Sequence, residues 1–124
     1  MTDAERFPWM RAPAAIAGRW RVSPSGCQTI GGMVVEIKIP ADSPRTATGR
    51  VVTPGDGAKL GYRSGEEVMR LEANDHGNWP GKVKWRNILG VQRWDPVYFV
   101  LRDRGELDGT MAPDSCWRSM TWTR

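Results

Sequence analysis

The sequence predicts an all-β fold, a single antiparallel up-and-down barrel of about eight strands. Short segments of alternating side chains follow one another from Gly18 onward, and clusters of Gly, Pro, Asp and Asn separate them. The 124 residues leave room for one domain. Because closure removes the exposed edges of a sheet, a closed barrel is favoured over an open one. We therefore expect residues 1–16 to form an irregular leader and residues 17–124 to form the barrel.

The first half of the barrel is predicted from side-chain alternation with a period of two. Residues 18–22 and 33–39 each place apolar side chains on one face and charged ones on the other. Residues 46–53 and 60–64 are separated by Pro54-Gly55-Asp56-Gly57, a composition that favours a tight turn. The pattern therefore predicts a hairpin between these two segments.

The second half continues in the same way. Residues 66–73 alternate well enough to favour a strand over a helical turn, and residues 81–87 alternate clearly. Residues 97–102 are apolar on both faces, as in a strand covered on both sides. Residues 106–111 and 116–124 complete the barrel. We expect no helix after residue 17.

Composition limits the class of protein. Hydrophobic residues make up 40% of the chain and charged residues 26%, which is typical of globular domains. No apolar run approaches the roughly 20 residues of a membrane helix, and the first residues do not resemble a signal peptide. With two cysteines in the whole chain, we expect a soluble, reduced, cytoplasmic protein without a membrane partner.

The net charge of +4 raises the question of a polyanionic partner. However, 18 basic residues are interspersed with 14 acidic ones rather than clustered, which argues against nucleic acid as the main partner. A small hydrophobic molecule is the expected partner, and a homodimer is compatible with the sequence.

The start of the first strand resembles a known group of barrels. Gly18-Arg19-Trp20 after a short leader is similar to the Gly-x-Trp that opens the first strand of calycins, which include lipocalins and avidin-like proteins. The resemblance implies that Trp20 packs at one end of the barrel beneath a basic residue, Arg124 or Arg118. It also implies a cup for a small apolar or amphipathic molecule, and it transfers no catalytic residue.

A second segment resembles another family. Residues 81–87, Gly-Lys-Val-Lys-Trp-Arg-Asn, are similar to the opening strand of cold-shock domains, whose aromatic side chains stack on single-stranded bases. The aromatic second strand that should follow is replaced by Ile88-Leu89-Gly90-Val91. A single-stranded nucleic-acid or inhibitor module using Lys82, Lys84 and Arg86 is therefore kept as a third hypothesis.

Aromatic side chains supply the candidate binding site. A barrel of eight strands either packs solid or holds one small ligand, and ligand pockets are mostly apolar with a few polar groups. The chain has seven tryptophans, of which Trp20 and Trp122 are assigned to the core. The candidate lining comprises Tyr62, Met69, Trp79, Trp85, Trp94, Phe99 and Trp117.

Catalysis without a cofactor is the alternative hypothesis, because orienting a reactive substrate can by itself accelerate a cyclisation or isomerisation. The candidate catalytic groups are Glu67, expected to face inward with Met69, together with Asp95 and Tyr98. The single histidine, His76, lies in a turn-like segment, and no recognised metal-ligand spacing is present. We therefore expect no metal and no cofactor.

The two ends of the barrel sequence predict one pairing. If the first and last strands are antiparallel neighbours with Trp20 opposite Thr123, the same register places Cys27 opposite Cys116. That geometry allows a disulfide if the Cβ atoms approach within about 4.5 Å.

Overall fold

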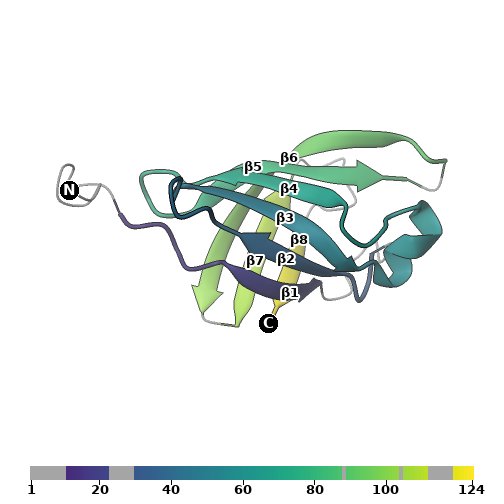
Figure 1. The fold of residues 1–124 in the computed structure, drawn as a ribbon, viewed down its shortest axis with the longest axis horizontal. Helices are drawn as coiled ribbons and strands as arrows, with labels where there is room; N and C mark the ends of the chain where they lie inside the picture. Colours follow the sequence, from purple (N-terminus) through teal and green to yellow (C-terminus); the bar gives the residue numbers. More distant parts are fainter. Residues whose placement is uncertain (1–10, 23–29, 88, 104, 112–118) are drawn as a thin grey trace.

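The described residues form one closed antiparallel barrel whose strands follow one another in sequence order (Figure 1). The computed structural model describes residues 11–22, 30–87, 89–103, 105–111 and 119–124. An all-β fold and a closed eight-strand barrel are thus confirmed. The strands are β1 (Gly18–Val22), β2 (Val34–Lys38), β3 (Thr46–Thr53), β4 (Glu67–Glu72), β5 (Trp79–Arg86), β6 (Gln92–Asp103), β7 (Glu106–Met111) and β8 (Ser119–Thr123).

Alternation along each strand fills the interior of the barrel. In β3, Ala47, Gly49 and Val51 are buried while the residues between them are exposed or half-buried, as the period of two requires. The inward side chains of the described strands are large and almost wholly buried. They include Trp20, Ile37, Met69, Trp79, Phe99, Leu107 and Trp122. Gly109 leaves room for the Phe99 ring. A Cβ atom at Gly109 would lie 2.6 Å from that ring.

The first and last strands are antiparallel neighbours, as predicted, but the predicted register is wrong by one residue. Thr123 lies opposite Arg21, and Trp122 lies opposite Val22. Trp20, Val22 and Trp122 all face the interior. Directly opposite residues must face the same side of a sheet, so a register with Trp20 opposite Thr123 would have turned Trp122 to the outside. Cys27 and Cys116 lie outside the described residues.

The predicted hairpin between residues 46–53 and 60–64 is wrong. Pro54 leads into a short 3-10 helix, η1 (Gly55–Leu60), which ends at Gly61 in a left-handed conformation with φ of 92°. The chain then folds back so that Tyr62 is buried, and β3 pairs with β4 instead. Because η1 is a short helix, the expectation of no helix after residue 17 is also wrong. Proline and the turn residues that follow it allow a tight helical turn here.

One end of the barrel is sealed by the described part of the leader, residues 11–17, and we call it the leader end. Ile16 is fully buried and its carbonyl oxygen accepts a hydrogen bond from the Trp20 indole at 2.8 Å. The Trp79 indole donates to the Ala14 carbonyl at 3.0 Å. Arg124 donates to Ala15 at 2.6 Å and lies 4.4 Å from the centre of the Trp20 ring.

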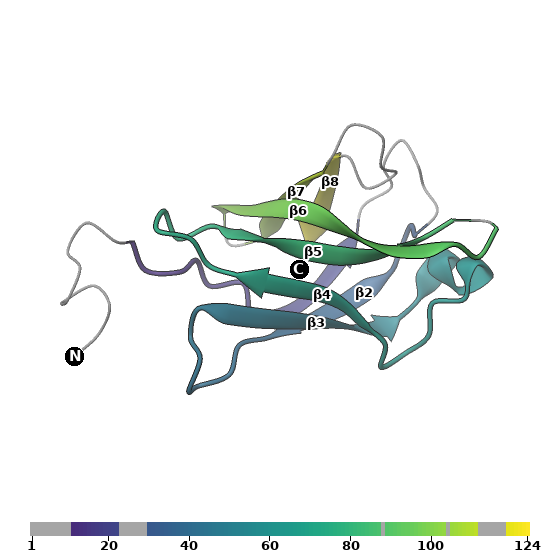
Figure 2. The same cartoon turned by 90° about the horizontal axis from the view of Figure 1, so that it is seen from above.

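Strands β5 and β6 extend beyond their neighbours at the opposite end of the barrel. The last β4–β5 pair at this end is Met69 with Val83, whereas β5 and β6 remain paired as far as Arg86 with Gln92. We call residues 84–95 the arm. Figures 1 and 2 both place the turn of the arm beside η1 and far from the leader. We call this the arm end of the barrel.

Candidate functional site

The inner face of the arm carries one aromatic and two charged side chains. Trp85 lies directly opposite Arg93, and Asp95 lies opposite Val83 one step deeper. The Arg93 guanidinium is 5.1 Å from the centre of the Trp85 ring. Its Nε lies 2.9 and 3.0 Å from the two carboxylate oxygens of Asp95, whose side chain is 13% exposed. The arrangement combines an aromatic surface with a fixed ion pair.

The indole of Trp85 also has a buried N–H group. Its indole nitrogen Nε1 is buried and makes no hydrogen bond within the part of the chain that the structure describes. The indoles of Trp20 and Trp79, in contrast, each donate to a leader carbonyl. A buried donor without an acceptor costs about 1 to 3 kcal/mol. An acceptor from another molecule would remove that cost.

The outer edge of the arm is braced by η1 and the residues after it. The pairing of β5 with β4 ends at Val83 and Met69, before the arm begins, so the backbone of β5 has no paired strand on this side here. The Tyr62 hydroxyl takes that place: it donates to the Lys84 carbonyl at 3.0 Å and accepts from the Arg86 amide at 2.9 Å. The Arg86 guanidinium in turn reaches Glu66 at 2.8 Å and the Gly61 carbonyl at 3.1 Å.

Burial and charge shift two pKa values in this brace. Desolvation by burial raises the pKa of Tyr62 well above its usual value, although the Arg86 amide and guanidinium oppose the shift. For Glu66, burial alone would raise the pKa. The hydrogen bonds from Arg86 and Arg63, with the nearby Lys84 ammonium at 3.3 Å, outweigh burial and lower that pKa below its ordinary value. Glu66 is therefore a charged anchor for the arm.

The three candidate catalytic groups do not share a face. Asp95 lies on the inner face of the arm. Tyr98 is exposed on the outer face, where its hydroxyl accepts hydrogen bonds from the side-chain amides of Asn74 and Asn78 at 2.9 and 3.0 Å. Asp95 is thus the candidate carboxylate that a molecule held against Trp85 could reach.

Glu67 does not face inward as expected. A β-bulge shifts the β3–β4 register between Gly49 and Arg50, so that Val68 and Met69 are both buried and Glu67 lies opposite Arg50 on the outer face. An extra residue in one strand reverses the face of the sheet on which each preceding side chain of that strand lies. The Glu67 carboxylate pairs there with Arg50 and Arg70.

The candidate lining residues separate into an interior set and an outer set. Met69, Trp79 and Phe99 fill the barrel interior with 1% exposure or less. Trp94 lies on the outer face of the arm, with Arg70 at 4.4 Å and Lys84 at 5.4 Å from its ring centre. Trp117 lies outside the described residues. The structure therefore brings Trp85 and Asp95 together and leaves Trp94 on the opposite face.

The basic residues of the nucleic-acid hypothesis are largely engaged with a carboxylate. Lys84 and Arg86 both pair with Glu66, and all three side chains are less than 20% exposed. Lys82 remains exposed on the outer face of β5. Glu66 offsets one of the two positive charges of Lys84 and Arg86, and their low exposure leaves Lys82 as the exposed cation of the three, which is a weak attraction for a polyanion.

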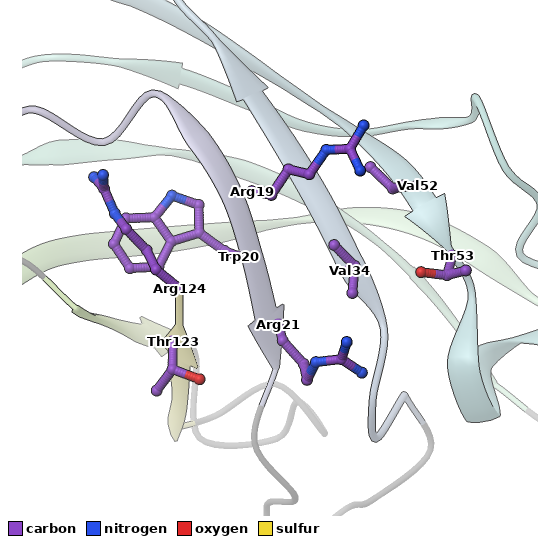
Figure 3. A pocket seen from close by; sticks show the side chains of 8 residues that line it. All are labelled: Arg19, Trp20, Arg21, Val34, Val52, Thr53, Thr123 and Arg124. Carbon is purple, nitrogen blue, oxygen red and sulfur yellow. The ribbon is translucent and has the colours of Figure 1, made fainter.

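A separate hollow of about 290 Å³ lies on the outer wall of the barrel, and Figure 3 shows its side chains. It crosses β8, β1, β2 and β3. Its lining is Arg19, Trp20, Arg21, Val34, Val52, Thr53, Thr123 and Arg124.

Comparisons with protein-family models, with curated proteins and with solved structures find no match. Within the described ranges, no three His, Cys, Asp or Glu side chains gather closely enough to hold a metal ion. No helix in those ranges is long and apolar enough to cross a membrane.

Sequence reasoning missed Arg93, Glu66 and Arg21. A signal for Arg93 was present, because it shares the period-two phase of Asp95 and therefore the same face of β6. The pairing of Glu66 with Arg86 depends on the backward fold after η1, which has no local signal. The outer position of Arg21 was evident from its alternation with Trp20. Its neighbours across the sheet, Thr123 and Val34, depend on strand register and have no local signal.

Proposed function

We propose that the protein binds a small hydrophobic or aromatic molecule at the arm end of the barrel, against the inner face of the arm. The observation that carries the proposal is the Trp85 indole, an aromatic surface beside the Arg93–Asp95 pair whose N–H group has no acceptor among the described residues. Binding sites of this kind are mostly apolar with a few placed polar groups.

The packing of the interior places the ligand near the end of the barrel rather than deep inside it. Val83 is fully buried one pair below Trp85, and Phe99, Met69 and Trp79 fill the space beyond. A ligand at the level of Trp85 would cover this apolar layer without displacing it. The sealed leader end leaves the arm end as the side from which the ligand enters.

The chemistry of the site narrows the class of ligand. A flat apolar ring would pack on Trp85, and the Trp85 N–H would donate to an acceptor on that ring or its substituent. Asp95 would accept from an N–H or O–H group of the ligand, because its ion pair with Arg93 holds the carboxylate in a fixed orientation. An uncharged aromatic molecule with one hydrogen-bonding group meets these conditions.

The Trp20–Arg124 stack at the leader end gives independent support. The resemblance of Gly18-Arg19-Trp20 to calycins implied this contact, and the two groups lie 4.4 Å apart. Gly18 also has a φ of 128°, a conformation that favours glycine. A calycin-like barrel that carries a small ligand is consistent with both features.

The proposal is tested by titrating the protein with N-phenyl-1-naphthylamine, an uncharged aromatic probe with one N–H group, and following its fluorescence. Trp85→Ala should weaken binding at least about tenfold, since aromatic contact and buried area each contribute on the order of 1 kcal/mol. Trp94→Ala is the matched control, because Trp94 is nearby on the opposite face. Equal affinities of the two variants, or no saturable binding to the wild type, would overturn the proposal.

A further inference from the structure

The outer-wall hollow in Figure 3 has a positive lining. Among the described residues, three arginines line it, Arg19, Arg21 and Arg124, and no carboxylate side chain does. Two threonines stand on either side of Arg21, and in Figure 3 the hydroxyl oxygens of Thr53 and Thr123 lie on the sides that face it. Val34 and Val52 supply an apolar floor.

Register explains why Arg21 differs from the other outward arginines. One row across the sheet runs from Arg19 to Glu36 and Arg50, so positive and negative side chains alternate. The adjacent row runs from Thr123 through Arg21 and Val34 to Thr53. Arg21 therefore has neutral neighbours on both sides.

The charges of the other two arginines are already partly balanced or engaged. Arg19 lies 3.6 Å from Glu36. Arg124 stacks on Trp20 and donates to the Ala15 carbonyl. Arg21 has no ion pair with any residue that the structure describes, and it is exposed. Its guanidinium is the group of the hollow that is available to a ligand.

We propose that this hollow binds a small organic phosphate monoester. The planar guanidinium of Arg21 offers paired donors that match phosphate oxygens, and one hydroxyl of the same row, that of Thr53 or of Thr123, offers a further donor. Arg19 and Arg124 add positive potential. The apolar floor of Val34 and Val52 fits a short carbon group attached to the phosphate.

The size of the hollow agrees with that class. About 290 Å³ is at the lower limit of ordinary ligand pockets, so the hollow suits a phosphate with one ring rather than a nucleotide. The site lies on the outer wall, whereas the Trp85 site lies on the inner face of the arm. The two sites are therefore separable by mutation.

The test is a calorimetric titration with phenyl phosphate, and the Nε–H signals of the arginines are followed by NMR in parallel. Arg21→Gln should weaken binding at least about tenfold through loss of a charge-assisted pair of hydrogen bonds. Arg102→Gln is the control: it removes the same charge, but Arg102 already pairs with Asp108 at 2.9 Å on another face. It should change the affinity by less than about twofold.

Each outcome decides the proposal. Weaker binding of phenyl phosphate by Arg21→Gln alone, with the Arg21 Nε–H signal shifting in the wild type, supports it. Equal losses in both arginine variants would mean that net charge alone attracts the ligand, and would overturn it. Unchanged binding in Arg21→Gln would also overturn it. Trp85→Ala should bind phenyl phosphate normally, so this test and that of the arm site fail or succeed independently.

Discussion

Replacing Tyr62 by Phe removes one oxygen atom from the junction between η1 and the arm. Tyr62 is 2% exposed, and its hydroxyl is bonded to the Lys84 carbonyl at 3.0 Å and to the Arg86 amide at 2.9 Å. The phenylalanine ring fills the same space, so no cavity forms. Two backbone groups of β5 lose their partner at a point where the pairing of β5 with β4 has ended.

The magnitude follows from those two hydrogen bonds. Each contributes about 0.5 to 1.5 kcal/mol, and a backbone group left shielded from water adds to the loss, so the free energy of unfolding should fall by about 2 to 4 kcal/mol. For a domain of this size the Tm should fall by roughly 10 °C. Urea unfolding followed by circular dichroism measures the change, with an unaltered slope as the sign of two-state behaviour.

Tyr98→Phe is the matched control for this measurement. The Tyr98 hydroxyl also takes part in two hydrogen bonds, but it accepts both of them, from the side-chain amides of Asn74 and Asn78 at an exposed site. Water can replace the lost oxygen there, so we expect less than about 0.5 kcal/mol. If Tyr62→Phe costs no more than Tyr98→Phe, the hydroxyl does not brace the arm and the reasoning is refuted.

Three further substitutions test the account of the fold. Glu66→Gln should lower the free energy of unfolding by about 1 to 2 kcal/mol at pH 7. The folded pKa of Glu66 lies below its ordinary value of 4.5, so urea titrations should show this difference shrinking as the pH falls below that value. A pH-independent difference would contradict the ion pair. Gly81→Ala places a Cβ atom 2.1 Å from the Arg70 carbonyl oxygen and should lower stability by about 1 to 3 kcal/mol. Gly105→Ala, whose Cβ atom would have its nearest neighbour at 3.8 Å, should be nearly neutral in thermal unfolding. Similar effects of the two variants would refute the close approach of β4 and β5. Arg124→Gln should lower stability by about 0.5 to 2 kcal/mol through loss of the Trp20 stack and shift the emission of the buried tryptophans, and an unchanged spectrum and stability would contradict the seal.

Local patterns were sufficient for most of the barrel. The bounds of β1, β3 and β7 match the alternating segments, because each of these strands has one buried and one solvated face. Strand β6 begins earlier than predicted, at Gln92 rather than Val97. Its first residues belong to the arm. Pro96, directly after the arm, is tolerated because β6 up to this residue pairs with β5 alone among the described strands.

Errors arose where long-range contacts override a local signal. Pro54-Gly55-Asp56-Gly57 has the composition of a hairpin turn, but burial of Tyr62 against the arm favours η1 instead. The bulge at Val68 reverses the facing of Glu67, and alternation alone has no means of detecting an extra residue in a strand. For the candidate site, Trp85 and Trp94 were both plausible lining residues, and the strand register placed them on opposite faces.

The indole N–H signals of the tryptophans test the central claim, that a ligand binds against Trp85, most directly. In a nitrogen-15 NMR titration with N-phenyl-1-naphthylamine, the signal that disappears in Trp85→Phe should shift progressively and saturate in the wild type. The signals of Trp20 and Trp79 should stay in place, because their indoles are bonded to Ile16 and Ala14. A shift of the Trp79 signal or the Trp94 signal with Trp85 unmoved would contradict the claim.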